Sequence, residues 1–223
     1  VNAAAASDAG WFDDLVVPFM DLEEDNNIRR DSTLEKLAKL KPVFDKGEDA
    51  TLTAGNSTPL TDGAAAVLLA NDEWARLKNL PIAAYLSFIK VAAVNFIDDE
   101  GLLMAPAYAV SDMLKDANLR LQDFDFYEIH EAFAAQTIAT LKAWQSEKFC
   151  RDRLGRNEPL GPIDLSKLNV KGGSIAMGHP FAATGARIVG VMAKLLAEKG
   201  SGRGLISVCT AGGMGVTAIM EAA

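Results

Sequence analysis

The sequence predicts an α/β fold in which helices are layered on a mixed β-sheet. From residue 50 onwards, segments of strand length alternate with segments of helical periodicity, which is typical of this class. Apolar residues make up 49% and charged residues 23% of the 223 residues, so the chain can bury a substantial core. The last two apolar runs are joined by the turn "TAGGMG", which favours a mixed sheet over a purely parallel one.

The N-terminal third contains few regular elements. Residues 1–50 lack a sustained period and predict a loop-rich segment that packs on something else, with one short helix within 31–44 that ends at Pro42. Next, "ATLTAG" (50–55) predicts a strand and "AAAVLLAN" (64–71) a buried apolar run. The following "DEWARLKN" predicts a short helix.

The middle of the chain alternates between the two periodicities. Residues 81–96 contain several β-branched and aromatic side chains and predict a strand, and residues 124–129 predict a second. Helices are expected over 105–118, with Pro106 at a first-turn position, and over 131–149. The second helix is expected to bury one side, formed by Ala134, Ala135, Ile138, Leu141 and Trp144.

The last 40 residues predict one helix and two strands. The helix is expected over 185–200 and is closed by Gly200. The strands are "GLISVC" and "MGVTAIMEAA", on either side of the glycine turn. The buried face of the helix is expected to comprise Ile188, Val189, Met192, Leu195 and Leu196.

Charge and composition exclude several kinds of protein. A net charge of −8 makes nucleic acid a poor partner, and no apolar run has the length of a transmembrane span or the form of a signal peptide. The two cysteines make no disulfide framework and nothing resembles a metal-ligand cluster, so we expect no metal. The chain is therefore predicted to be intracellular.

Three side chains that could carry chemistry lie at junctions between a strand and a turn. His130 follows a predicted strand, His179 lies between Gly178 and Pro180, and Cys209 precedes "TAGG". Such residues are more often satisfied core or surface histidines and small buried cysteines. Their shared position favours acyl chemistry instead, with histidine as base or donor, cysteine as nucleophile or base, and amides as an oxyanion hole. These patterns leave open a cysteine hydrolase, an acyltransferase and a ligand-binding protein.

Several blocks, in order along the chain, resemble the thiolase family. They are "DAGWFDDLVVPF" (8–19), "TAGNSTPLTDGAAAV" (53–67), "HEAFAAQ" (130–136), "NVKGGSIAMGHPFAATGARIV" (169–189) and "CTAGGMG" (209–215). The histidine that opens the third block resembles the variant of β-subunits in trifunctional fatty-acid-oxidation complexes. The likeness covers nearly the whole chain.

This resemblance implies a thiolase-like layered fold and a coenzyme-A-dependent acyltransferase. The reaction would be cleavage of 3-ketoacyl-CoA by CoA, as in fatty-acid β-oxidation, or the reverse Claisen condensation, with CoA as substrate and no permanently bound cofactor. His179 would activate the nucleophilic cysteine and help bind the thioester oxygen, and Cys209 would move the proton at the α-carbon of acetyl-CoA. His130 would contact the oxygen in the first oxyanion hole, where an asparagine is usual.

The resemblance also implies supporting roles for six other residues. Ala211, through its backbone N–H, and Gly212 would belong to the second oxyanion hole, and Glu131 would support the site from behind. Substrate and CoA contacts are expected from the pocket wall and the loop before it, at Phe133, Thr58 and Ser57.

One departure concerns the family's nucleophilic cysteine, which neither Cys150 nor Cys209 matches. The resemblance therefore implies the C-terminal portion of a thiolase, one half of its two-fold repeat plus part of the loop domain. The expected domains are the remainder of the loop domain (1–50), the end of the N-terminal core (51–73) and the C-terminal core (74–223). We expect an exposed apolar face, and the missing N-terminal half on another chain or lost by truncation.

The expected partners are acyl-CoA, CoA, the missing half, further copies in a homodimer or homotetramer and, by analogy, an α-subunit. The expected compartment is the cytoplasm in a bacterium, and the mitochondrion or peroxisome in a eukaryote. Two alternatives are a thiolase-like protein that binds CoA or lipid without catalysis, and a structural half-domain that serves only in assembly. The presence of both His179 and Cys209 argues against a pure binder.

Overall fold

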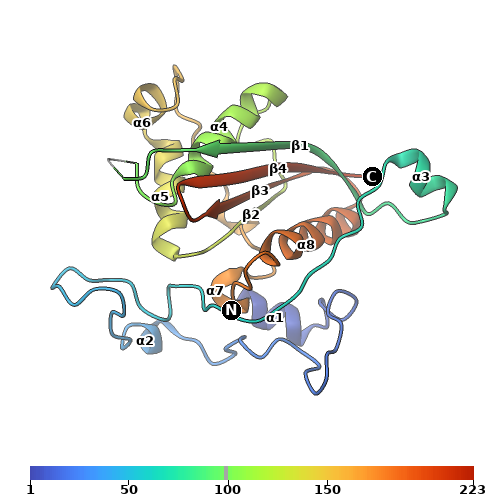
Figure 1. Cartoon of the computed structure of the whole chain (residues 1–223), viewed down its shortest axis with the longest axis horizontal. Coiled ribbons are helices and arrows are strands. Elements are labelled where there is room, and N and C mark those ends of the chain that lie inside the picture. Colours follow the sequence, from blue (N-terminus) through green and yellow to red (C-terminus); the bar gives the residue numbers. More distant parts are fainter. Residues whose placement is uncertain (98–99) are drawn as a thin grey trace.

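A four-stranded mixed sheet lies at the centre of the C-terminal part of the chain (Figure 1). The computed structural model describes residues 1–97 and 100–223, and its sheet has the order β1-β4-β3-β2. The β2–β3 pair is parallel, whereas β3–β4 and β4–β1 are antiparallel, which confirms the predicted mixed sheet. The strands are β1 (Ala84–Ala93), β2 (Phe126–Ile129), β3 (Arg203–Thr210) and β4 (Met214–Ala222).

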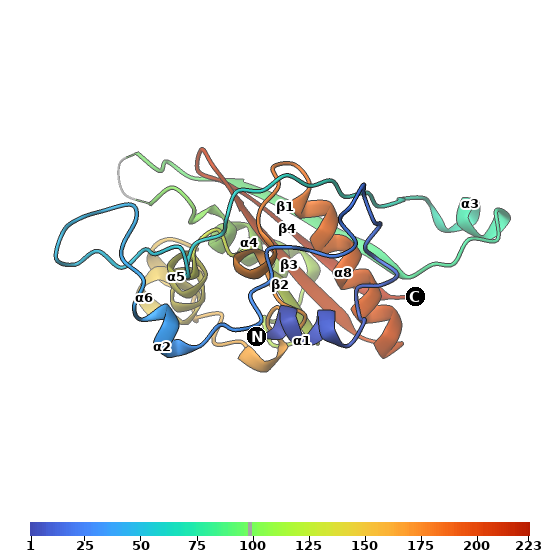
Figure 2. The ribbon, with the colours of Figure 1, turned by 90° about the horizontal axis from the view of Figure 1, so that it is seen from below.

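Helices cover both faces of this sheet (Figures 1 and 2). One face carries α4 (Ala105–Ala117), α5 (Ala134–Gln145) and α6 (Glu147–Asp152), and the other carries α8 (Thr184–Lys199). Successive side chains of a strand point to opposite faces, so Leu205 packs with Trp144 in one core and Ile206 with Met192 in the other. The predicted α/β layering is therefore confirmed, with two apolar cores separated by the sheet.

Local signals place most of these elements where the sequence predicts them. Pro106 lies in the first turn of α4, and both α4 and α8 end at a left-handed residue, Asn118 and Gly200. A helix over the predicted "DEWARLKN" is found as α3 (Asp72–Leu77). The face expected for α8 is largely correct, since Ile188, Met192, Leu195 and Leu196 are all buried.

The helix predicted over 131–149 is wrong in its extent and in its buried face. Phe133 is extended and α5 begins only after it, and Ser146 then ends α5 and caps α6 by accepting the Phe149 N–H. Ile138 is 52% exposed, because it lies on a side of α5 that does not face the core. The residues of α5 that are buried are Thr137, Thr140, Ala143 and Trp144.

Two predictions for the N-terminal third are also wrong. Residues 50–55 form no strand, because the Asn56 side chain takes up the Thr53 N–H and the Thr51 carbonyl and so builds a turn. The run 64–71 is extended but exposed rather than buried, and no strand of the described residues pairs with it. The helix within 31–44 is only α2 (Leu34–Leu37), which ends before Pro42.

The first 28 residues pack on the rest of the chain at separate points, as expected for a segment that packs on another element: residues near the start lie on the outer side of α8 (Figure 2), and Ala3 and Ile28 lie against Met177. They begin with α1 (Asn2–Asp8), whose Ala6 joins Trp11 against Val191 and Leu195. The Trp11 indole N–H donates to Glu198 at 2.8 Å. This contact fixes the start of the chain to the helix that follows the His179 turn.

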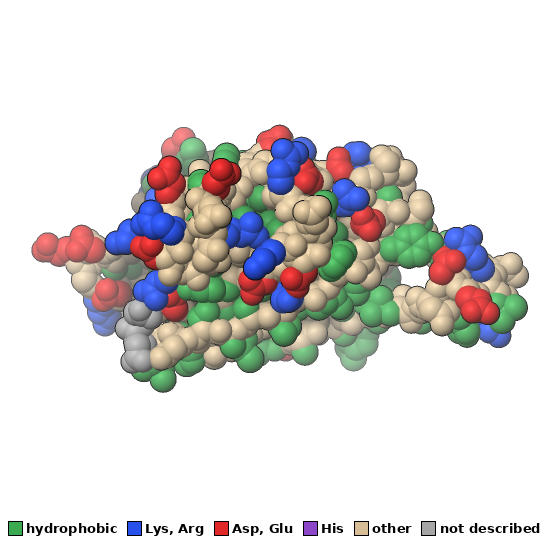
Figure 3. Space-filling view, turned by 90° about the horizontal axis from the view of Figure 1, so that it is seen from above, with side chains coloured by type: hydrophobic (Ala, Val, Ile, Leu, Met, Phe, Trp, Pro, Cys, Tyr) green, Lys and Arg blue, Asp and Glu red, His purple; other side chains and the backbone are tan. Residues whose placement is uncertain are grey.

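Part of the surface is apolar. Hydrophobic side chains gather along one long side of the view in Figure 3. On the edge strand β1, Phe88, Ile89 and Val91 are 41%, 59% and 66% exposed. Apolar surface is therefore exposed on the sheet, as expected from the sequence. Within the part of the chain that the structure describes, no helix combines the length and apolarity needed to cross a membrane.

Candidate active site

The two histidines lie side by side, although 49 positions separate them in the sequence. Their ring centroids are 4.3 Å apart and the rings are tilted by 45°. His130 directly follows β2, and His179 lies in the turn between α7 (Ser174–Met177) and α8. The sheet therefore delivers one imidazole and the glycine-rich turn the other to the same place.

The end of β2 positions His130 rigidly. Its backbone N–H donates to the Ser207 carbonyl at 2.9 Å, and the Asn169 side chain both accepts from and donates to the backbone of Ile129. The imidazole is 3% exposed, and its Nδ1 lies 2.8 Å from the Ser174 hydroxyl. Burial lowers the pKa of His130 to about 3, so the ring is neutral at neutral pH.

A strained turn holds His179, as the sequence predicts. Gly178 has φ +89°, and a Cβ at that position would lie 2.5 Å from the Thr61 side chain, so only glycine fits. The His179 N–H donates to the Pro59 carbonyl at 2.9 Å, and its Nδ1 lies 2.6 Å from the Thr184 hydroxyl. Burial, aided by the charge of Arg187, lowers the pKa of this half-buried imidazole.

Cys209 lies near the end of β3 and shares a small cavity of about 10 Å³ with His130. The cavity is also lined by Thr137 and Ser207. Burial raises the pKa of the Cys209 thiol to about 11, although the backbone N–H of Ala132 favours the thiolate. The thiol therefore keeps its proton at neutral pH, which suits a proton donor better than a resting nucleophile.

Glu131 lies against Gly173 and the start of α7. Its Oε2 accepts the Ile175 N–H at 3.3 Å, and a Cβ on Gly173 would lie only 2.2 Å from the same oxygen. A side chain at Gly173 would therefore push the carboxylate away. This geometry fits the supporting role that the sequence predicts for Glu131.

The loop at 56–60 runs across the two histidine segments. Thr58 donates its hydroxyl to the Ser174 carbonyl at 2.6 Å and its N–H to the Ala132 carbonyl at 3.0 Å. Ser57 forms a β-bridge with Phe133 and is buried. These three residues are thus placed at the site, and their expected contact with CoA stays a prediction.

Ala211 and Gly212 follow Cys209 in the exposed turn between β3 and β4. Gly212 has φ +85°, which lets the chain reverse directly after the thiol. Their backbone amides are therefore close in sequence to Cys209 and open to solvent. The expected oxyanion contact of Ala211 stays a prediction.

Sequence reasoning missed the residues that hold the two imidazoles. Ser174 and Thr184 each contact one Nδ1, and Arg187 donates to the Ser174 hydroxyl at 3.1 Å. All three lie within the block quoted for the resemblance, but no local pattern says which side chain they meet. The only available signal was the presence of hydroxyl groups and an arginine on either side of a glycine-rich turn.

A buried carboxyl lies close behind the site. Glu128 of β2 is 1% exposed, and burial raises its pKa to about 8 against the opposing charge of Arg187. Burial likewise lowers the pKa of Arg187, again opposed by Glu128. Each charge favours the ionised form of the other, but burial is the larger effect, so Glu128 keeps its proton at neutral pH.

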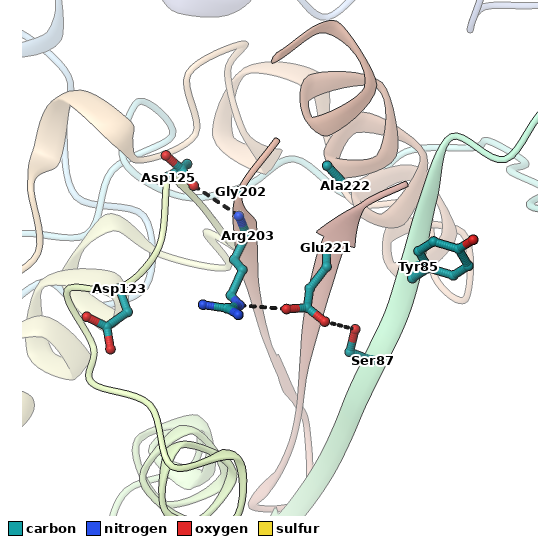
Figure 4. A pocket seen from close by; sticks show the side chains of 8 residues that line it. All are labelled: Tyr85, Ser87, Asp123, Asp125, Gly202, Arg203, Glu221 and Ala222. Carbon is teal, nitrogen blue, oxygen red and sulfur yellow. Dashed lines mark hydrogen bonds and ion pairs between the residues drawn. The ribbon is translucent and has the colours of Figure 1, made fainter. Parts of the chain in front are cut away.

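A larger hollow of about 610 Å³ lies at the opposite end of the strands and is open to solvent. Figure 4 shows that it is lined by polar groups that pair with one another. Arg203 contacts Glu221 at 2.6 Å, and Glu221 accepts from Ser87 at 2.6 Å. Arg203 and Cys209 are at the two ends of β3, about 20 Å apart at the usual rise per residue. This hollow is therefore separate from the histidine pair. Among residues 1–97 and 100–223, no group of three or more potential metal ligands comes together.

Family models match almost the whole chain. The model described as "Thiolase, C-terminal domain" matches residues 80–222, and "Thiolase, N-terminal domain" matches residues 1–73. The chain is 46% identical over 225 aligned residues to a 3-ketoacyl-CoA thiolase of Yersinia pestis (strain Pestoides F), covering 98% of this chain and 51% of that protein. The chain thus spans about half the length of the curated relatives it matches.

Solved structures of related proteins have the same fold. The dimeric peroxisomal thiolase of Saccharomyces cerevisiae superposes with a TM-score of 0.83 at 35% identity, over all of this chain and 52% of that one. The human mitochondrial 3-ketoacyl-CoA thiolase in complex with CoA gives a TM-score of 0.79 at 33% identity, with the same coverage. The fold predicted from the sequence is confirmed by both.

Proposed function

The chain belongs to the thiolase family, and from this premise we propose that it supplies the proton-transfer half of a CoA-dependent acyltransferase. The reaction is the cleavage of 3-ketoacyl-CoA by CoA to acetyl-CoA and a shortened acyl-CoA, or the reverse condensation. The observation that carries the proposal is that His130 lies beside His179 and also shares a cavity with Cys209, although the three side chains come from separate elements.

The protonation states support a division of roles. Breaking the carbon–carbon bond expels an acetyl-CoA enolate, which needs a proton at carbon and donors at its oxygen. The protonated thiol of Cys209 can supply that proton. A neutral His130 can donate to an oxygen, with the amides of Ala211 and Gly212 as further donors, and Glu131 holds the start of α7 by accepting the Ile175 N–H.

The reaction also needs a nucleophilic cysteine. His179 would act as the base that activates a thiol, but neither cysteine of this chain suits that role. Cys209 is needed for proton transfer, and Cys150 is fully buried in the core, where its thiol faces the Ala143 and Trp144 carbonyls. We therefore place the nucleophilic cysteine outside these 223 residues, in the half of the family's length that this chain does not match.

Coenzyme A is proposed as substrate, not as a resident cofactor, with contacts at Ser57, Thr58 and Phe133. The human relative was solved with CoA bound, and the yeast relative is described as dimeric. A homodimer or homotetramer is proposed on this basis. An α-subunit partner and the cytoplasmic, mitochondrial or peroxisomal location stay predictions from the sequence.

The test uses the complete polypeptide with acetoacetyl-CoA or longer 3-ketoacyl-CoA and CoA. His179→Ala is expected to abolish formation of the acyl-enzyme, whereas Cys209→Ser should leave acylation largely intact and block carbon–carbon cleavage. Rapid-quench measurement of both half-reactions separates them. Equal loss of both in Cys209→Ser would contradict the division of roles. Absence of turnover at every chain length would favour a protein that binds CoA or lipid without catalysis.

A further inference from the structure

The two neighbouring imidazoles have different hydrogen-bond partners at Nδ1. That of His130 faces Ser174, and that of His179 faces Thr184. Both partners are hydroxyl groups, which can either donate or accept. Whether each hydroxyl donates to Nδ1 or accepts from it depends on the other hydrogen bond that the hydroxyl makes.

Ser174 has one further bond at its hydroxyl oxygen. Arg187 Nη2 lies 3.1 Å away and can only donate, so this bond occupies a lone pair of the oxygen. Ser174 is completely buried, and its hydroxyl proton therefore needs an acceptor. Within the described part of the chain, the acceptor found at hydrogen-bond distance is Nδ1 of His130, at 2.8 Å. That nitrogen then carries no proton, and the neutral ring holds its proton on Nε2.

The Thr184 hydroxyl has the opposite role and accepts a hydrogen bond from its histidine. The hydroxyl donates to the Pro180 carbonyl at 3.3 Å, one turn earlier in the chain, and a carbonyl can only accept. The single hydroxyl proton is thereby committed. Toward Nδ1 of His179, 2.6 Å away, the oxygen can only accept, so the ring donates from Nδ1 and keeps a free lone pair on Nε2.

We propose that Ser174, supported by Arg187, and Thr184 lock the two imidazoles in opposite tautomers: His130 with its proton on Nε2, and His179 with its proton on Nδ1. Both rings are neutral, since burial and the positive charge of Arg187 oppose protonation of each. The acidic groups whose charges act on Arg187 are Glu128 of β2, Glu131 of the following loop and Asp25 of the N-terminal segment. Ser174 and Thr184 are thus positioning residues that act through the two histidines.

The consequence is a division of labour between two identical side chains 4.3 Å apart. The free lone pair on Nε2 makes His179 a base that can take the proton of a thiol. The Nε2–H makes His130 a donor to an oxygen that becomes negative. This use of the tautomers rests on the proposed function, whereas the tautomers themselves follow from the hydrogen bonds alone.

The experiment is ¹⁵N–¹H correlation spectroscopy of the imidazole nitrogens in the complete polypeptide near neutral pH, without substrate. The signals are assigned with His130→Gln and His179→Gln variants. The expected result is one ring protonated at Nε2 and the other at Nδ1. Two rings in the same tautomer, or the two tautomers exchanged between the assigned rings, would overturn the proposal.

Variants then test the cause. Ser174→Ala should release His130 from its single tautomer, whereas Ser207→Ala, which removes another buried hydroxyl lining the cavity, should not. Thr184→Val should release His179. Its control is Thr137→Val, since that hydroxyl is buried without a hydrogen-bond partner. An unchanged His130 spectrum in Ser174→Ala would refute the role of Ser174.

Activity separates this inference from the proposed function. Opposite tautomers in a protein that cleaves no 3-ketoacyl-CoA would sustain the tautomer assignment and refute the enzyme. Thiolytic cleavage by a protein whose two rings share one tautomer would support the proposed enzyme and refute the tautomer assignment.

Discussion

Two apolar segments of this chain have similar composition and opposite surroundings. Residues 204–209 of β3 and residues 64–69 are both short and hydrophobic, yet Leu205 and Ile206 are 0% and 4% exposed, whereas Leu68 and Leu69 are 74% and 64% exposed. The β3 segment has a strand on either side and helices on both faces. Within the described residues, residues 64–69 have no paired strand and are not covered by helices on both faces. Burial is therefore decided by the available partners and not by the hydrophobicity of a segment.

The largest expected effect tests the packed segment. Leu205→Ala removes a fully buried side chain from the core between the sheet and α4, and should lower the free energy of unfolding by about 2–5 kcal/mol. Urea unfolding of residues 1–223, followed by circular dichroism, measures it. A loss below about 1 kcal/mol would show that the core around β3 is looser than its burial indicates.

A second prediction concerns the carboxyl in the packed region. The pKa of Glu128 is raised from 4.5 to about 8, so the folded protein holds a proton that the unfolded chain releases. Its contribution to stability is therefore complete below about pH 4.5 and is lost as the pH rises through 8. Glu128→Gln lacks this proton equilibrium. Between pH 5 and 8, the unfolding free energy of the parent should fall relative to Glu128→Gln by at least about 1 kcal/mol, and parallel curves would contradict the shift.

The N-terminal segment is intermediate between these two segments in how far it is packed. The first 28 residues are loop-rich but gain a partner in α8, through Trp11 and Glu198. Trp11→Phe keeps the aromatic packing and removes the indole N–H, so it should cost about 1 kcal/mol in unfolding free energy. The control Glu198→Gln keeps an acceptor at the same place. Similar unfolding curves for Trp11→Phe and the parent would show that packing alone holds this segment.

The smallest effect is expected for the exposed segment. Leu68→Ala makes the same chemical change as Leu205→Ala, but at a side chain that is 74% exposed. In residues 1–223 it should change the unfolding free energy by no more than about 0.5 kcal/mol. A cost close to that of Leu205→Ala would break the comparison, because it would mean that Leu68 is covered in solution.

Much of the fold could be predicted because its signals are local. The strand β3, the turn after Cys209 and the capped helix α8 each follow from residue periodicity and glycine placement. The failures occur where contacts made by particular side chains outweigh the periodicity of the segment. In 50–55 a side-chain turn at Asn56 outcompetes the strand, and Ser146 divides the helix predicted over 131–149 by capping a second one. The buried run predicted at 64–71 is wrong because burial needs a partner.

The candidate site shows the same limit. His130, His179 and Cys209 could be singled out because each lies at a junction between a strand and a turn, and the resemblance supplied their roles. Nothing local indicates that Ser174 meets His130, since 44 positions separate them. The low pKa of His130 and the high pKa of Cys209 also arise from burial by segments far away in the sequence.

The sequence by itself determined the α/β class, the thiolase family and the identity of the chemically competent side chains, because periodicity, glycine turns and motif order are carried by neighbouring residues. The tertiary structure alone decided which apolar runs are buried, which hydroxyl faces which imidazole, and how each ionisable group is protonated. These properties depend on removal from water and on hydrogen bonds across the fold, and both exist only once distant segments have come together.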